Sequence, residues 1–165
     1  MRKPDFFIVG APKCGTTAMQ YYLSQHPDIF MPEAKPPYFK GKELHFFGSD
    51  LKFRRPSLSE DDYPSYFREA KDEKRVGEAS VWYLYSKLAA IEIKECCPRA
   101  SIIIMLRNPV DMIYSLHSQQ VYNRNEDITS FREALQAEYE RKKGLRIPKT
   151  VHLVEGLFYR ETVKF

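Results

Sequence analysis

Short apolar runs alternate along the chain with longer segments in which apolar residues recur at helical spacing. Residues 6–9, 75–79 and 101–106 are predicted to be strands. The last of them, SIIIML, is the strongest strand in the sequence. It is continuous and rich in β-branched residues, as a buried parallel strand should be. Three strands that alternate with helices predict an α/β fold in which helices flank a parallel sheet.

Helical patterns fill most of the remaining sequence. We expect helices at residues 16–25, 61–70, 81–96, from 109 onward, 130–143 and 151–165. The helix from 109 has the clearest start, because Asn108 can cap it and Pro109 suits its first turn. Its apolar face is expected to comprise Val110, Ile113, Tyr114, His117 and Val121. The proline-rich segment at 26–37 and the residues that follow it up to 57 are predicted to be irregular.

The composition is that of a globular protein, since 43% of the 165 residues are hydrophobic and 29% are charged. We expect one domain over residues 1–165. Because three strands form a small sheet and the last residues fall inside a helical pattern, that domain is expected to be a truncated three-layer domain. Without a signal peptide or a long apolar run, and with no disulfide pattern among the three cysteines, a cytoplasmic location is predicted. The net charge of +4 is a mild bias towards anionic ligands, and no nucleic-acid partner is expected.

The segment FFIVGAPKCGTT resembles a nucleotide-binding P-loop, but its lysine is displaced. Gly10, Gly15 and Thr17 stand where a P-loop has its two glycines and its hydroxyl, whereas Thr16 occupies the lysine position and the lysine is Lys13. A tight loop between a strand and a helix aims backbone N–H groups and the helix dipole at one point, which suits phosphate or sulfate. We call residues 10–17 the anion loop. The alternative is a glycine turn that only joins a strand to a helix.

The residue that follows the SIIIML strand is a cation. Nucleoside-triphosphate hydrolysis requires Mg²⁺, which an acid at the end of the neighbouring strand helps to hold, and here that position is Arg107. Ser115 lies about two helical turns further on and would reach the same group. The pattern therefore favours a ligand with two anionic groups and no metal. A surface salt bridge for Arg107 and a Mg²⁺-dependent P-loop kinase or NTPase remain the alternatives.

Several motifs together resemble the PAPS-dependent sulfotransferases, in particular the carbohydrate (Golgi-type) branch and its bacterial relatives. They are PKCGTT, LRNPVDMIYS, KGKELHFFGSD, HPDIFMP, GEASVWYL and SFREAL. The resemblance implies a P-loop-kinase-like fold and 3′-phosphoadenosine 5′-phosphosulfate (PAPS) as the donor, used without a metal. It also implies two sets of cofactor-binding residues: Lys13, Cys14, Gly15, Thr16 and Thr17 for the 5′ end, and Arg107 and Ser115 for the 3′-phosphate.

The same resemblance assigns a general base, because the glutamate of the KELHFF segment serves as the base in that branch. Here it is Glu43, with His45 as an assisting or alternative base, and Lys13 would stabilise the leaving phosphate. The neighbouring phenylalanines would desolvate Glu43 and raise its pKa. The alternative is that Glu43 pairs with Lys40 or Lys42 while His45 only packs. His117, on an apolar helix face, is expected to be a packed histidine.

Two departures from the family bear on the acceptor, which is expected to be a small-molecule or carbohydrate hydroxyl. Ala18 stands where cytosolic members carry a tryptophan, which favours the carbohydrate branch, and Ala79 stands where glycosaminoglycan enzymes carry a lysine. The basic loop from 35 to 55 either favours an anionic or sugar acceptor or is only a solvated loop. A non-catalytic fragment that binds PAPS or its product remains a third hypothesis.

Overall fold

The computed structural model describes residues 2–32, 43–54 and 58–164. The chain forms two compact units, each with its own packed interior. One unit, here called the sheet unit, comprises residues 1–50 and 57–106. The other, the helical unit, comprises residues 51–56 and 107–165.

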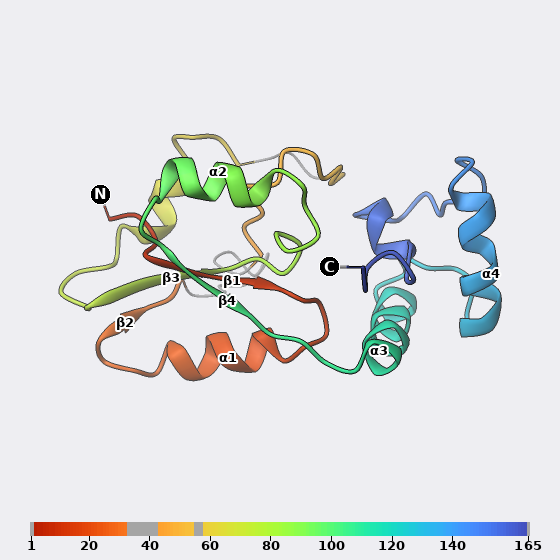
Figure 1. The fold of residues 1–165 in the computed structure, drawn as a ribbon, viewed down its shortest axis with the longest axis horizontal. Helices are drawn as coiled ribbons and strands as arrows, with labels where there is room; N and C mark the ends of the chain where they lie inside the picture. The colour runs from red at the N-terminus through yellow and green to blue at the C-terminus, as the bar shows by residue number, and fades with distance from the viewer. Residues whose placement is uncertain (1, 33–42, 55–57, 165) are drawn as a thin grey trace. The chain divides into compact units, whose positions relative to one another are not determined.

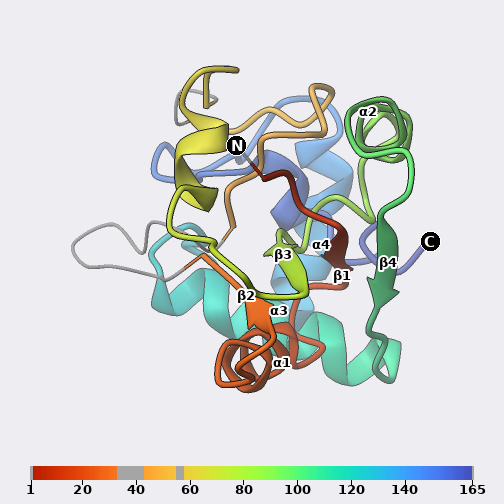
Figure 2. The ribbon, with the colours of Figure 1, turned by 90° about the vertical axis from the view of Figure 1, so that its left-hand side faces the viewer.

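The sheet unit is built on four parallel strands in the order β2-β3-β1-β4, as Figure 2 shows. They are β1 (Phe6–Gly10), β2 (Ile29–Phe30), β3 (Arg75–Ala79) and β4 (Ser101–Ile104). This arrangement confirms the predicted α/β fold with a parallel sheet. The short strand β2 was not predicted, because its two residues lie within a proline-rich segment that reads as irregular.

Two helices cover opposite faces of this sheet: α1 (Thr16–Leu23) lies on one side and α2 (Ala89–Cys96) on the other (Figure 1). The alternating side chains of β1 supply both interiors. Phe6 and Ile8 pack in a cluster with Met19 and Leu23, whereas Phe7 and Val9 pack with Ile93. The central strand is therefore buried along its whole length.

The strand β4 is less covered than the sequence indicates. It lies at the edge of the sheet, and Ile102 and Ile104 are 48% and 52% exposed. The prediction of a buried strand at 101–106 was wrong on this point, although the strand itself is present. β-branched residues predict an extended backbone, but they do not indicate whether another element packs against the strand.

The helix α2 begins eight residues later than the predicted start at 81. The hydroxyl of Ser86 accepts hydrogen bonds from the amides of Leu88 and Ala89, at 3.1 and 2.9 Å. Residues 81–85 form turns instead, and the amide of Leu84 donates to the carbonyl of Val9 at 2.8 Å. The N-cap residue is Leu88, and the Ser86 hydroxyl two residues before it satisfies the first amides of the helix. The predicted helix at 61–70 is a single 3₁₀ helix, η1 (Tyr63–Phe67).

The helical unit contains α3 (Pro109–Tyr122), α4 (Phe131–Arg141) and the 3₁₀ helix η2 (Val154–Leu157). The predicted cap of α3 is confirmed, because the side chain of Asn108 accepts from the amide of Val110 at 3.0 Å. The predicted apolar face is displaced around the helix: Val110 and Tyr114 are exposed, and the buried residues are Met112, Leu116, His117 and Gln120. The predicted helix at 151–165 is wrong, since among the described residues 151–164 only η2 forms.

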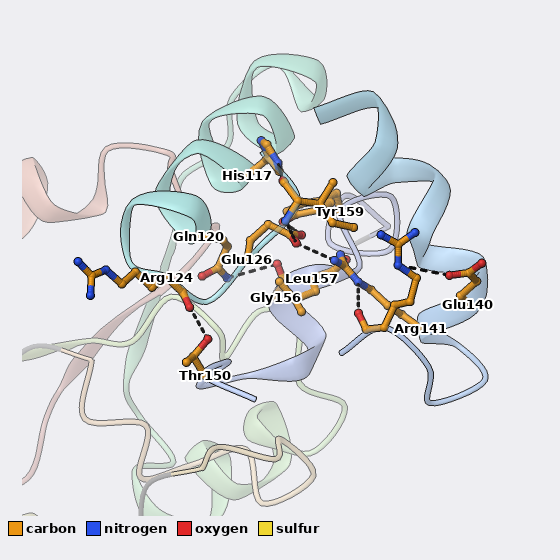
Figure 3. A network of polar contacts seen from close by, with 12 residues as sticks. His117, Gln120, Arg124, Glu126, Glu140, Arg141, Thr150, Gly156, Leu157 and Tyr159 are labelled. Carbon is orange, nitrogen blue, oxygen red and sulfur yellow. Dashed lines mark hydrogen bonds and ion pairs between the residues drawn. The ribbon is translucent and has the colours of Figure 1, made fainter. Parts of the chain in front are cut away.

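A buried ion pair lies at the centre of the helical unit (Figure 3). The guanidinium of Arg141 donates to the carboxylate of Glu126 at 2.7 Å, and both side chains are fully buried. The Tyr159 hydroxyl donates to the other carboxylate oxygen at 2.9 Å. Burial raises the pKa of Glu126, but the hydrogen bonds from Arg141 and from the amide of Ile128 outweigh it and hold this pKa below the ordinary value. His117 packs here as predicted, with Nε2 lying 2.8 Å from the carbonyl of Ile128.

Candidate functional site

The anion loop joins β1 to α1 at the carboxyl end of the sheet. Its two glycines are required by the backbone. A Cβ on Gly10 would lie 2.6 Å from the carbonyl oxygen of Val81, and Gly15 has φ 82° where it caps α1. The loop is tied to the end of β4, because the amide of Ala11 donates to Met105 at 2.7 Å and the amide of Met105 donates to Gly10 at 2.8 Å.

The anion loop presents features that fit a bound phosphate or sulfate. The N-cap residue of α1 is Gly15, which has no side chain to cap the first turn, and that turn contains no acidic residue. Lys13 is half-buried and adopts φ 62°, in the left-handed region that only a few non-glycine residues occupy. Thr16 is buried, Thr17 is exposed, and Cys14 is buried with its thiol 3.5 Å from the carbonyl of Pro12. The loop thus combines a cation with a helix N-terminus, as its sequence predicts.

Glu43 and His45 lie on a second loop, residues 43–47, which we call the base loop. The carboxylate oxygen Oε2 of Glu43 is 3.3 Å from Nε2 of His45, with the side chains 27% and 7% exposed, respectively. Both residues have positive φ angles, 55° and 48°. Backbone in this region is strained for non-glycine residues and clusters at functional sites. The structure therefore brings the two predicted base candidates into one pair.

Both loops lie against Val81, which follows β3. The amide of Val81 donates to Oε2 of Glu43 at 2.9 Å, and its carbonyl is the group against which Gly10 packs. The amide of Glu43 in turn donates to the carbonyl of Ala79 at 2.9 Å. In open α/β sheets, ligands bind in the crevice outside the carboxyl ends of the strands, and both loops lie at that end.

Arg107 and Ser115 belong to the helical unit. Arg107 is exposed and immediately precedes the cap residue of α3, while Ser115 is half-buried two turns into that helix. Arg107 is also the second residue after Met105, the residue that is bonded to the anion loop. The Cα atoms of Met105 and Arg107, two residues apart in the chain, are therefore at most about 7 Å apart. In the segment 35–55, which is rich in lysine and arginine, Lys52 and Arg54 are exposed. The other cations of that segment lie outside the described residues: Lys35, Lys40, Lys42 and Arg55.

Sequence reasoning missed one constituent of this region, the carboxylate of Glu78 on β3. It is completely buried, on the same face of the sheet as Val76. Its Oε1 accepts from the hydroxyls of Ser80 and Tyr83, both at 2.7 Å, and its Oε2 accepts from Tyr63 at 2.5 Å. The pKa of Glu78 is raised, because the effect of burial outweighs the three hydroxyl hydrogen bonds, which lower it. A charged residue at an inward-facing strand position is the sequence signal that would have revealed it.

A parallel α/β sheet with an anion loop after its first strand is the arrangement of the P-loop-kinase-like fold. Comparison with known proteins identifies the family. Residues 3–157 match the family described as "Sulfotransferase domain". The chain therefore belongs to the sulfotransferase domain family.

Individual relatives agree with this assignment. Over 119 residues, or 72% of the chain, it is 34% identical to the human bifunctional heparan sulfate N-deacetylase/N-sulfotransferase 2. It is 28% identical over 111 residues to the membrane-associated sulfotransferase kil1 of Dictyostelium discoideum, which covers 66% of this chain. A crystal structure of a sulfotransferase from Alicyclobacillus acidocaldarius matches 98% of the chain with a TM-score of 0.81 and 39% identity.

The chain spans only part of these relatives: 13% of the human protein, 21% of the Dictyostelium protein and 64% of the bacterial chain. Within the described part of the chain, no helix is long and apolar enough to cross a membrane. The cellular location and the single-domain boundaries stay predictions.

Proposed function

We propose that the chain catalyses transfer of a sulfuryl group from PAPS to an acceptor hydroxyl on a carbohydrate. The observation that carries this proposal is the meeting of the anion loop and the base loop at Val81. A group that binds a phosphosulfate and a group that deprotonates an acceptor must lie close together for in-line transfer. Membership of the sulfotransferase domain family supports the same reaction.

The residues of the anion loop fit the 5′ end of the cofactor, because α1 begins at a glycine cap and its first turn carries no acid. PAPS, when bound, supplies the sulfuryl group and a phosphate leaving group. The proposed ligands are Lys13, Cys14, Gly15, Thr16 and Thr17. Lys13 and the amides of the helix N-terminus would stabilise the negative charge that develops on the leaving phosphate.

Arg107 and Ser115 are proposed to hold the 3′-phosphate. Arg107 is the second residue after Met105, whose backbone is bonded to Gly10 and Ala11, so a short length of chain joins it to the anion loop. An arginine offers fixed donors that match a phosphate. We propose a reaction without a metal, because this cation stands where a P-loop enzyme has the acid that helps to hold Mg²⁺.

Glu43 is the proposed general base. Its Oε2 is held by the amide of Val81 and lies 3.3 Å from Nε2 of His45, so the histidine orients the carboxylate or shares its proton. His45 as the base itself remains the alternative. In either case the base loop would accept the proton that the acceptor loses.

A carbohydrate acceptor is proposed because several relatives are named as bifunctional heparan sulfate N-deacetylase/N-sulfotransferases. Ala79 occupies the position at which glycosaminoglycan enzymes carry a lysine, and it is fully buried. The position offers no charge to an anionic sugar, so we expect an acceptor with fewer acidic groups than heparan sulfate. A panel of neutral and desulfated oligosaccharides, assayed with radiolabelled PAPS, tests this expectation.

Calorimetry with adenosine 3′,5′-bisphosphate in EDTA tests the proposal for the cofactor. We expect binding without a metal, weakened about tenfold or more in Lys13→Ala because a hydrogen bond to a charged group is lost. Lys87→Ala removes an exposed lysine elsewhere and is the matched control. Binding that requires Mg²⁺ and a nucleoside triphosphate would instead favour a P-loop kinase or NTPase.

Glu43→Gln separates catalysis from binding. We expect the transfer rate to fall by about 10²–10⁴-fold while affinity for adenosine 3′,5′-bisphosphate is retained. Loss of both together would remove Glu43 from the role of base. Binding without transfer to any acceptor by the wild-type chain would favour the non-catalytic fragment.

A further inference from the structure

The base loop is held by hydroxyl groups that are themselves held by the buried carboxylate of Glu78. The amide of His45 donates to Oγ of Ser80 at 3.1 Å. The amides of Phe46 and Phe47 donate to the hydroxyl of Tyr83, at 3.0 and 3.4 Å. Both hydroxyls donate in turn to Oε1 of Glu78. Three successive amides of the base loop thus connect to one carboxylate through two hydroxyls.

We propose that Glu78 is a positioning residue for catalysis, which acts through Ser80 and Tyr83 to fix the backbone that presents Glu43 and His45. This inference rests on the proposed role of the base loop in deprotonating the acceptor. Glu78 itself is completely buried, so it contacts neither substrate nor cofactor.

The physical basis is the direction of the hydroxyl hydrogens. The hydroxyls of Ser80 and Tyr83 both donate to Oε1 of Glu78, so their hydrogens point towards Glu78. Their oxygen lone pairs are then left to accept the loop amides. Tyr83 is fully used in this way, with one hydrogen donated and two amides accepted. Without an acceptor at position 78, these hydrogens would turn elsewhere and compete with the amides for the same oxygens.

The aromatic contacts show which further side chains this arrangement fixes. The ring of Tyr83 packs edge-on against His45 and Phe47, with ring centroids 6.2 and 5.7 Å apart. Tyr63, the third donor to Glu78, stacks on Phe46 with ring centroids 4.0 Å apart. The hydrogen bond given above for its hydroxyl goes to the carboxylate of Glu78. Tyr63 and Tyr83 therefore share the same carboxylate, while only Tyr83 receives amides of the base loop.

Amide hydrogen exchange, measured residue by residue by NMR, tests the proposal without requiring turnover. In Tyr83→Phe we expect exchange at residues 46 and 47 to accelerate about tenfold or more, because their acceptor is lost. In Ser80→Ala the acceleration should fall on residue 45, and in Glu78→Met on all three. Glu78→Gln should stay near the wild type, because its amide oxygen still accepts from Ser80 and Tyr83 while its NH₂ group donates to Tyr63.

Tyr63→Phe is the matched control, since it removes one hydroxyl from the same carboxylate and leaves the loop amides bonded. We expect exchange at residues 45–47 to change by less than about threefold there. Equal effects of Tyr63→Phe and Tyr83→Phe would overturn the proposal, as would unchanged exchange in Ser80→Ala. If Glu78→Met does not fold, the two hydroxyl variants still decide the matter.

Kinetics complete the test. In Tyr83→Phe we expect kcat to fall at least about tenfold, while the affinity for adenosine 3′,5′-bisphosphate stays within about twofold of the wild type, because the anion loop does not contact Tyr83 through the bonds described. An active wild type with unchanged kcat in Tyr83→Phe would overturn the positioning role alone. A wild type that neither binds the bisphosphate nor transfers sulfate would overturn the proposed function instead, and the exchange data would still report on the bonds.

Discussion

The two units each bury a glutamate, and they stabilise it in different ways. In the helical unit the carboxylate of Glu126 is paired with the guanidinium of Arg141, which lowers the pKa of the acid against the effect of burial. In the sheet unit the carboxylate of Glu78 accepts hydrogen bonds from three hydroxyls, and burial raises its pKa. The contrast teaches that a buried acid can serve two purposes. With a cation it joins segments of the chain, and with hydroxyls it orients the donors around it.

The segments that each carboxylate connects support this distinction. Glu126 joins the end of α4 to Tyr159, and Arg141 also donates to the carbonyl of Leu157 at 3.3 Å (Figure 3). Glu78 connects to the base loop. We therefore expect loss of the first to affect folding, and loss of the second to affect folding less and catalysis more.

The largest effect should come from removing Arg141, the buried cation of the helical unit. Arg141→Met leaves Glu126 buried without a counter-charge, which should lower the free energy of unfolding by about 3–5 kcal/mol. Urea unfolding followed by circular dichroism measures the loss. The double variant Glu126→Gln with Arg141→Met should recover part of it, because no buried charge remains. A loss under about 1 kcal/mol would mean that the pair is not the stabilising feature that its burial indicates.

A smaller effect should follow from replacing the acceptor of the sheet unit. Glu78→Met leaves three buried hydroxyls without their common acceptor and should lower the free energy of unfolding by about 1–3 kcal/mol. Glu78→Gln should stay close to the wild type, whereas Glu126→Gln should not, because an amide cannot neutralise Arg141. Fluorescence of Trp82, the one tryptophan of the chain and a buried residue of the sheet unit, follows the unfolding of that unit. Equal losses in the two glutamine variants would erase the distinction between the two glutamates.

The sequence predicts the local parts of this site well and the long-range parts poorly. The anion loop is contiguous, so its glycines, Lys13 and the helix start were predicted from the segment FFIVGAPKCGTT alone. The meeting of Glu43 with Val81 joins residues 38 positions apart, and no local pattern encodes it; only the family resemblance pointed to Glu43. Glu78 was missed because its strand was correctly predicted and its inward direction was not considered.

The errors in the fold have a similar origin. The late start of α2 depends on Ser86, whose hydroxyl also donates to Asp50, a contact between segments distant in sequence. The burial of β4 depends on what packs against it, which the strand's own residues do not specify. Patterns along the chain thus predicted which elements form more reliably than which of their faces are covered.

The pH dependence of stability should have opposite signs at the two glutamates. The pKa of Glu78 is raised, so its contribution is fully present below the ordinary carboxyl pKa and is lost as the pH rises through the raised value. The pKa of Glu126 is lowered, so its contribution is present above the ordinary value and is lost as the pH falls through the lowered one. Relative to wild type, Glu78→Gln should therefore gain stability with rising pH, by at most about 1.4 kcal/mol per pH unit, and Glu126→Gln should lose it. Parallel unfolding curves from pH 3 to 8 measure both trends, and trends of the same sign would contradict the comparison.

The smallest effects should come from the helix caps, and they tell whether the two units respond independently. Asn108→Ala removes the cap of α3 in the helical unit, and Ser86→Ala removes the acceptor for the first amides of α2 in the sheet unit. Each should cost about 1 kcal/mol. Because the bonds given above for Ser86 and for Asn108 each stay within one unit, the Trp82 signal should report Ser86→Ala and not Asn108→Ala. If both variants shift that signal equally, the two units unfold as one, and the effects of Arg141→Met and Glu78→Met must then be compared on one common free energy rather than unit by unit.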